Sequence, residues 1–61
     1  MSSKKARRRE AITALVVEQG AVTVGSLADR FDVSMQTIRR DVDTLCEGEM
    51  LHRVHGRIEL S

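Results

Sequence analysis

The chain has 61 residues and no apolar run long enough to cross a membrane or to form a signal peptide, so we expect one small domain in the cytoplasm. It contains one cysteine, which excludes an internal disulfide, and one aromatic residue, so its core must be mainly aliphatic. The formal net charge is +1, which argues little for nucleic acid, but half of the ten Lys and Arg residues lie between Lys4 and Arg9.

A first helix is predicted from about Lys5 to Gln19, and Gly20 suits the left-handed position that ends it. Three apolar residues share its inner face: Ile12, Leu15 and Val16. The basic cluster lies in an N-terminal arm at about 1–9, where no acid precedes Glu10. Such a cluster either contacts phosphates or forms a disordered, solubilising tail, and the sequence leaves both interpretations open.

A short second helix is predicted after a brief extended segment at Ala21 and Val22. Four apolar residues have the spacing of one helix face: Val24, Leu27, Ala28 and Phe31. Thr23 is a suitable N-cap, and Asp32 is expected in the left-handed conformation that closes the helix. The next helix starts so soon afterwards that it must leave at a steep angle, which predicts a helix-turn-helix.

The third helix is predicted from Met35 to Glu47, with Ser34 as its N-cap. Three apolar residues form its inner stripe: Ile38, Val42 and Leu45. The opposite side carries four polar residues, flanked by Thr37 and Arg39: Gln36, Arg40, Asp43 and Glu47. In the first two turns this face offers an amide and two guanidiniums, which suit purine edges and phosphates. A solvated helix surface is the ordinary alternative.

A hairpin is predicted from two short strands, 51–54 and 57–60, around His55-Gly56. We expect three of its apolar residues to close the open edge of the core: Val54, Ile58 and Leu60. Its polar residues Arg53, His55 and Arg57 would then approach a minor groove or neighbouring phosphates.

The sequence contains no pattern typical of catalysis. No nucleophile with a base, glycine-rich phosphate loop or apolar carboxylate pair is evident, so we expect neither an enzyme nor a cofactor. Cys46, His52 and His55 lack the paired spacing of zinc sites, and Cys46 is expected to pack near the core. Asp41 is the acid nearest the apolar stripe, and we expect it to orient an arginine, with Arg30 or Arg53 as the possible partners.

Residues 7–56 resemble the N-terminal winged helix-turn-helix domain of the DeoR family of bacterial transcription regulators. The resemblance is carried by several segments: Arg7-Arg8, Gly20-Ala21-Val22-Thr23-Val24, Leu27-Ala28-Asp29-Arg30-Phe31, Val33-Ser34, Thr37-Ile38-Arg39-Arg40-Asp41-Val42, Arg53-Val54 and His55-Gly56. The chain departs from the family at Asp32, where glycine is usual, and at Arg57-Ile58, where a glycine and a small residue are usual. The implied fold is mainly α with a small β-hairpin: one three-helix domain over 1–61 with its wing at about 51–60.

The resemblance implies sequence-specific binding of double-stranded DNA, and we expect a repressor of a sugar or polyol catabolic operon. Ten residues are the expected DNA contacts: Ser34, Gln36, Thr37, Arg39 and Arg40 in the third helix and its cap, and Arg8, Arg9, Arg53, His55 and Arg57 around it. The resemblance also implies an effector domain that binds a phosphorylated sugar and makes the protein a homo-oligomer. That domain is expected to be absent here, leaving a monomeric or weakly dimeric chain.

Two other functions fit a winged helix. The third helix could dock a protein partner, although its arginine pair and the basic arm argue against this. Binding to RNA is the second alternative, and the lack of exposed aromatic residues for base stacking lowers it.

Overall fold

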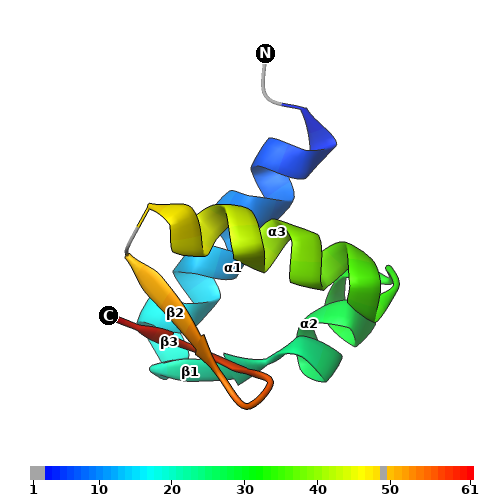
Figure 1. Ribbon diagram of the computed structural model, residues 1–61. Helices are drawn as coiled ribbons and strands as arrows, with labels where there is room; N and C mark the ends of the chain where they lie inside the picture. The colour runs from blue at the N-terminus through cyan, green and yellow to red at the C-terminus, as the bar shows by residue number, and fades with distance from the viewer. Residues whose placement is uncertain (1–2, 49) are drawn as a thin grey trace.

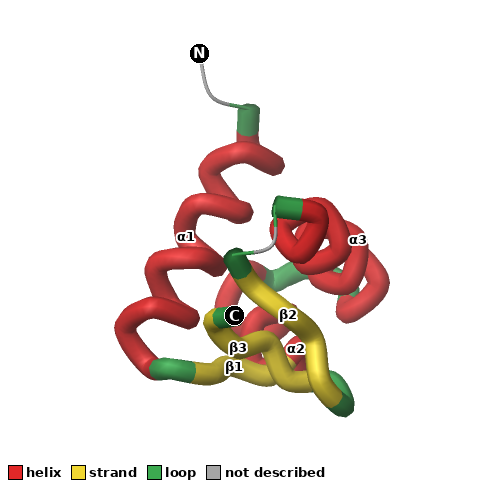
Figure 2. Tube along the Cα trace, turned by 60° about the vertical axis from the view of Figure 1, so that its left-hand side comes forward, coloured by secondary structure: helices red, strands yellow, loops and turns green. Residues whose placement is uncertain are grey.

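The computed structural model describes residues 3–48 and 50–61. Its six elements follow one another in chain order (Figure 1): α1 (Lys4–Gln19), β1 (Ala21–Thr23), α2 (Val24–Phe31), α3 (Met35–Glu47), β2 (Leu51–Val54) and β3 (Arg57–Leu60). In Figure 2, α1 and α3 lie on opposite sides of the view and the strands lie together below and between them. This is a winged helix-turn-helix, which confirms the predicted fold class.

The sheet has three antiparallel strands in the order β1-β3-β2, one strand more than the predicted hairpin. Val22 of β1 is paired with Ile58 of β3, and Arg53 of β2 is paired with the same Ile58 from the other side. A segment of three residues carries too little alternation to be assigned as a strand from sequence. Its partner lies more than thirty residues away, so only the folded chain reveals the pairing.

Each helix begins at a hydroxyl side chain that accepts a hydrogen bond from the backbone. Ser3 accepts from the Ala6 N–H at 3.1 Å, Thr23 from the Ser26 N–H at 3.1 Å, and Ser34 from the Thr37 N–H at 3.1 Å. The caps at Thr23 and Ser34 confirm the predictions. The cap at Ser3 places residues 4–9 of the basic cluster in the first turns of α1, whereas residues 1–2 of the predicted arm lie outside the described residues.

The turns adopt the backbone conformations that their residues suggest. Asp32 lies at φ 53° and ψ 49°, the left-handed conformation predicted for the end of α2. His55 and Gly56, which join β2 to β3, have φ values of 50° and 79°. Two successive positive φ values are typical of a tight two-residue hairpin turn, so the predicted hairpin is confirmed.

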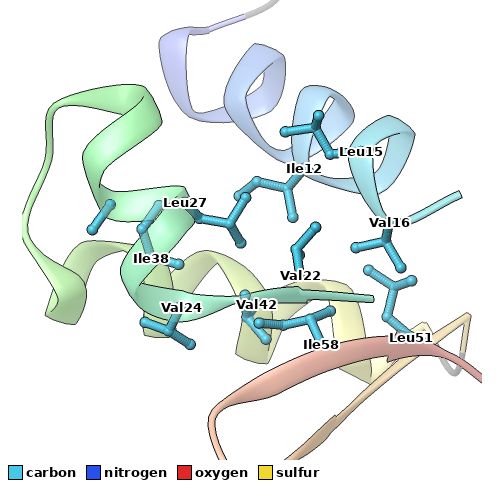
Figure 3. Packing of buried hydrophobic residues seen from close by; sticks show 11 residues of the cluster. Ile12, Leu15, Val16, Val22, Val24, Leu27, Ile38, Val42, Leu51 and Ile58 are labelled. Carbon is cyan, nitrogen blue, oxygen red and sulfur yellow. The ribbon is translucent and has the colours of Figure 1, made fainter. Parts of the chain in front are cut away.

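The core lies between the three helices and one face of the sheet (Figure 3). Its buried aliphatic residues come from all six elements: Ile12, Leu15, Val16, Val22, Val24, Leu27, Ala28, Ile38, Val42, Leu51 and Ile58. Phe31, Val33 and Leu45 are partly buried and pack against this cluster, as the sequence indicated for Phe31 and Leu45. None of the helices within the described ranges is long and apolar enough to span a membrane.

The prediction that Val54, Ile58 and Leu60 close the core was wrong for two of the three residues. Ile58 is fully buried, but Val54 is 39% exposed and Leu60 is 42% exposed. Alternation along a strand explains Val54, which is paired with Arg57 and therefore faces away from Ile58. Leu60 shares the face of Ile58 but lies at the end of the sheet, and Leu51 of β2 fills the core instead.

Candidate nucleic-acid interface

The outer face of α3 carries the polar residues that the helical period assigns to it. Gln36, Arg39 and Arg40 are exposed, whereas Ile38 and Val42 are fully buried. Since successive residues of an α-helix are turned by about 100°, the residues beside this face follow two flanks. Thr37, Asp41 and Thr44 follow the flank toward α1, and Arg39, Asp43 and Cys46 follow the flank toward β2.

The N-terminus of α3 is exposed and ordered by its own side chains. The Ser34 hydroxyl accepts the Thr37 N–H and lies 2.9 Å from the Thr37 hydroxyl, so the two hydroxyls share a hydrogen bond. Both side chains are therefore held at the end of the helix where the macrodipole favours anions. Gln36 and Arg40 lie within the first two turns beyond them. The arrangement combines hydrogen-bond donors and positive charge on one exposed surface.

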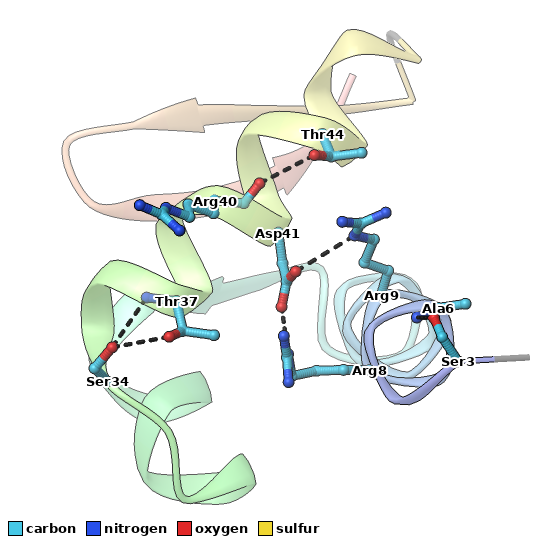
Figure 4. Close-up of polar contacts among 9 residues, drawn as sticks. All are labelled: Ser3, Ala6, Arg8, Arg9, Ser34, Thr37, Arg40, Asp41 and Thr44. Atoms are coloured by element: carbon cyan, nitrogen blue, oxygen red, sulfur yellow. Dashed lines mark hydrogen bonds and ion pairs between the residues drawn. The ribbon is translucent and has the colours of Figure 1, made fainter.

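Asp41 joins α3 to α1 and is the buried acid of the interface. Its side chain is 3% exposed, and Figure 4 shows it pointing from α3 toward Arg8 and Arg9. Arg8 Nε donates to Asp41 Oδ2, and Arg9 Nε donates to Asp41 Oδ1 at 3.3 Å. The prediction that Asp41 orients an arginine is confirmed, but the predicted partners Arg30 and Arg53 were wrong. Asp41 lies on the flank of α3 that faces α1, and a helical wheel of α3 alone does not say what covers that flank.

The two arginines of α1 differ in how much of each side chain reaches solvent. The Arg8 side chain is 15% exposed and the Arg9 side chain is 33% exposed. Arg8 therefore acts mainly in the contact between α1 and α3. Arg9 uses Nε for Asp41, which leaves its terminal nitrogens available to a ligand.

The predicted wing residues lie on different faces of the hairpin. Arg53 is paired with Ile58 and lies on the same face of the sheet, whereas Arg57 is paired with Val54 and lies on the other face. Arg53 Nη1 lies 3.3 Å from Asp43 Oδ1 of α3, and Arg57 Nη2 lies 2.7 Å from Glu59 Oε2. Such partly exposed ion pairs contribute little stability, so both guanidiniums can exchange their partners for phosphates. His55 lies exposed in the turn between them.

Two residues near this surface were not among the predicted contacts. Lys5 of α1 and Thr44 of α3 line a groove between the two helices. Arg40 and the ion-paired residues Arg8, Arg9 and Asp41 line it as well. The available signal for Thr44 was its spacing of seven from Thr37, which places both on the flank toward α1. Lys5 belongs to the basic cluster for which phosphate contact was one interpretation, but which members of that cluster face α3 depends on how α1 crosses α3.

Cys46 is partly buried and packs against the core, as expected. Burial raises the pKa of its thiol, Arg53 opposes this shift, and Asp43 adds to it. The thiol is therefore protonated near neutral pH, which disfavours metal binding or nucleophilic attack. Within residues 3–48 and 50–61, no group of three or more His, Cys, Asp or Glu side chains is placed to hold a metal ion.

Residues 8–61 match the family model of the DeoR-like helix-turn-helix domain. The chain is 43% identical over 53 residues to the glycerol-3-phosphate regulon repressor of Escherichia coli (strain K12), which covers 87% of the chain and 21% of that protein. It is 45% identical over 49 residues to the L-fucose operon activator of Haemophilus influenzae, covering 80% of the chain and 20% of the relative. It is 38% identical over 56 residues to the lactose phosphotransferase system repressor of Lactococcus lactis, covering 92% of the chain and 22% of the relative. The chain thus spans about a fifth of the length of these curated relatives. No solved structure matches it.

Proposed function

The chain belongs to the DeoR-like helix-turn-helix family, the DNA-binding domains of transcriptional regulators, and we propose that it reads the operator of a sugar or polyol catabolic operon as part of a repressor. The family is not one of enzymes, so the function lies in recognition. On this proposal α3 enters the major groove of double-stranded DNA. The protein acts in the cytoplasm, where bacterial operators are found.

The observation that carries the proposal is the outer face of α3. Gln36, Arg39 and Arg40 are exposed together in its first two turns, while Ile38 and Val42 anchor the opposite side in the core. An amide suits an adenine edge, and a guanidinium suits a guanine edge or a phosphate. The Ser34 and Thr37 side chains, at the N-terminus of α3, then contact the sugar-phosphate backbone of the DNA.

The surrounding basic residues supply binding that does not depend on sequence. Arg53, His55 and Arg57 of the wing contact phosphates or a minor groove on one flank of α3. Arg8 and Arg9 do so on the other flank, with Arg9 presenting the larger exposed fraction. Each phosphate neutralised in this way releases counterions, which makes the affinity fall with salt.

The type of operon and the direction of regulation are proposed from the named relatives. Two of the three relatives described above are repressors and one is an activator, and their names refer to glycerol-3-phosphate, lactose and L-fucose. A repressor of sugar or polyol catabolism is the choice most consistent with these names. Response to a phosphorylated sugar and formation of a homo-oligomer belong, on this proposal, to a part of such regulators outside the 61 residues.

The proposal is tested by fluorescence anisotropy of the chain with a labelled random-sequence DNA duplex across a salt series. We expect affinity to fall steeply and linearly in log salt, and an RNA duplex to compete poorly. Binding that is absent at low salt, from protein shown to be folded by circular dichroism, would contradict DNA binding. That result would favour the alternative in which α3 docks a protein partner.

A further inference from the structure

A groove of about 430 Å³ lies between the N-terminal turns of α1 and the flank of α3 that faces them. Four cationic side chains line it: Lys5, Arg8, Arg9 and Arg40. The hydroxyls of Thr37 and Thr44 also line the groove, but Thr44 Oγ1 donates to the Arg40 carbonyl at 3.2 Å and the Thr37 hydroxyl shares a hydrogen bond with Ser34. Lysine and arginine side chains form charge-assisted hydrogen bonds to phosphate oxygens, so the groove has the composition of an anion site.

The acids that line the groove leave much of its positive charge unneutralised. Asp41 is shared by Arg8 and Arg9, and Asp43 pairs with Arg53 of β2. Lys5 and Arg40 are both exposed, and neither forms an ion pair within the part of the chain that the structure describes. The groove therefore keeps a formal excess of two positive charges, which favours a ligand of one or two negative charges.

Asp41 also determines where Arg9 can reach. The Arg9 Nε–Asp41 Oδ1 contact of 3.3 Å holds the guanidinium at the groove while its terminal nitrogens remain available. Because the buried carboxylate fixes this side chain before any ligand arrives, little conformational entropy is lost on binding. Arg8, which is more buried, supports Asp41 from the other oxygen. Asp41 is thus a positioning residue for the groove.

Resting on the proposed function, we propose that this groove binds one phosphodiester of the DNA backbone through Lys5, Arg9 and Arg40. A helix lying in the major groove has a sugar-phosphate strand on each side. On the flank of α3 toward β2, where Arg53 pairs with Asp43, the wing contacts one of these strands. On the flank toward α1, beside the outer face that reads the bases, the groove binds the other strand. Arg40 is thereby assigned to a phosphate, and base reading falls to Gln36 and Arg39.

The first test compares Lys5→Gln and Arg9→Gln with Arg7→Gln in the salt series on random-sequence duplex DNA. Arg7 is exposed on the same turns of α1 but does not line the groove, so its variant controls for the loss of one charge. We expect the slope of log affinity against log salt to shrink for Lys5→Gln and for Arg9→Gln, each by at most the roughly 0.9 that one neutralised phosphate contributes, and to shrink less for Arg7→Gln. Equal slopes for all three charge variants would overturn the proposal.

The second test uses a duplex selected for tight binding, in which a neutral methylphosphonate replaces one phosphate at a time. We expect one position where the replacement weakens the wild-type chain more than it weakens Lys5→Gln. Because Lys5 is exposed, this variant should fold like the wild type. If every position affects both proteins alike, the groove does not hold a phosphate. Failure of the wild-type chain to bind any duplex would instead contradict the proposed function on which this inference rests.

Discussion

Asp41 is the side chain on which the contact between α1 and α3 depends most. It is buried to 3% exposure, and both of its oxygens accept hydrogen bonds from arginines of α1. A buried carboxylate is tolerated only when such partners compensate for its lost hydration. The same residue therefore supports the fold and sets the position of Arg9 beside α3.

Replacement of Asp41 by Asn should destabilise the domain by about 2 kcal/mol. The amide has nearly the same shape but no charge, so two partly buried guanidiniums lose their counterion. Because Arg9 is partly exposed, the cost stays below the roughly 3–5 kcal/mol typical of breaking a fully buried ion pair. Urea unfolding measures the change. Asp43→Asn is the matched control, since Asp43 is 62% exposed and should contribute less than about 1 kcal/mol. Equal unfolding midpoints for the two variants would show that Asp41 has no special role.

The role of Asp41 was predictable from sequence, but its partners were not. Its place near the apolar stripe of α3 marked it as an acid that needs an arginine. The choice between Arg30, Arg53 and the arginines of α1 depends on which element covers the flank of α3. That depends on tertiary packing, and the spacing within one helix holds no information about it.

Among the elements, α3 is the one that local sequence signals predict most clearly. Ser34 caps it, Ile38 and Val42 anchor it, and its exposed face carries Gln36, Arg39 and Arg40. Cap, period and polar face all point to the same helix, and its predicted bounds of Met35 and Glu47 are those observed. Local signals of this kind are reliable because each acts within four residues along the chain.

The cap of α3 should be measurable as a contribution to stability. Ser34→Ala removes the acceptor of the Thr37 N–H and should cost about 1 kcal/mol, whereas Ser34→Gly should cost only a few tenths. In a domain of this size, a loss of 1 kcal/mol lowers the midpoint of thermal unfolding by about 4 to 8 °C. Circular dichroism on heating gives both values. An alanine variant as stable as the wild type would indicate that water replaces the cap without loss.

The strands were predicted less completely than the helices. The bounds of β2 and β3 followed from the His55-Gly56 turn and the apolar residues around it, and the structure confirms them. The pairing of β1 with β3 and the exposure of Val54 were missed. The pairing of β1 with β3 joins residues far apart in the sequence, so local patterns do not reveal it. The exposure of Val54 follows from alternation across the two-residue turn and was predictable from the sequence.

At the scale of the whole molecule, α3 is held along both of its flanks. Asp41 ties it to α1, and Asp43 lies beside Arg53 of the wing. Basic side chains therefore border the outer face of α3 on two sides, although the net charge of the chain is only +1. The sequence indicated this clustering from the positions of the arginines. It did not reveal the groove, because that feature exists only where α1 and α3 cross.

The most direct test of the account is to compare the base preferences of the wild-type chain and Gln36→Ala. A preferred duplex is first selected from a random pool, and each base pair is then substituted in turn. We expect the wild-type chain to lose about 1 to 3 kcal/mol at each contacted pair, and Gln36→Ala to lose this preference at one position while retaining the others. Arg40→Ala should weaken all duplexes alike. No preferred sequence for the wild-type chain, or an unchanged profile in Gln36→Ala, would contradict base reading by the outer face of α3.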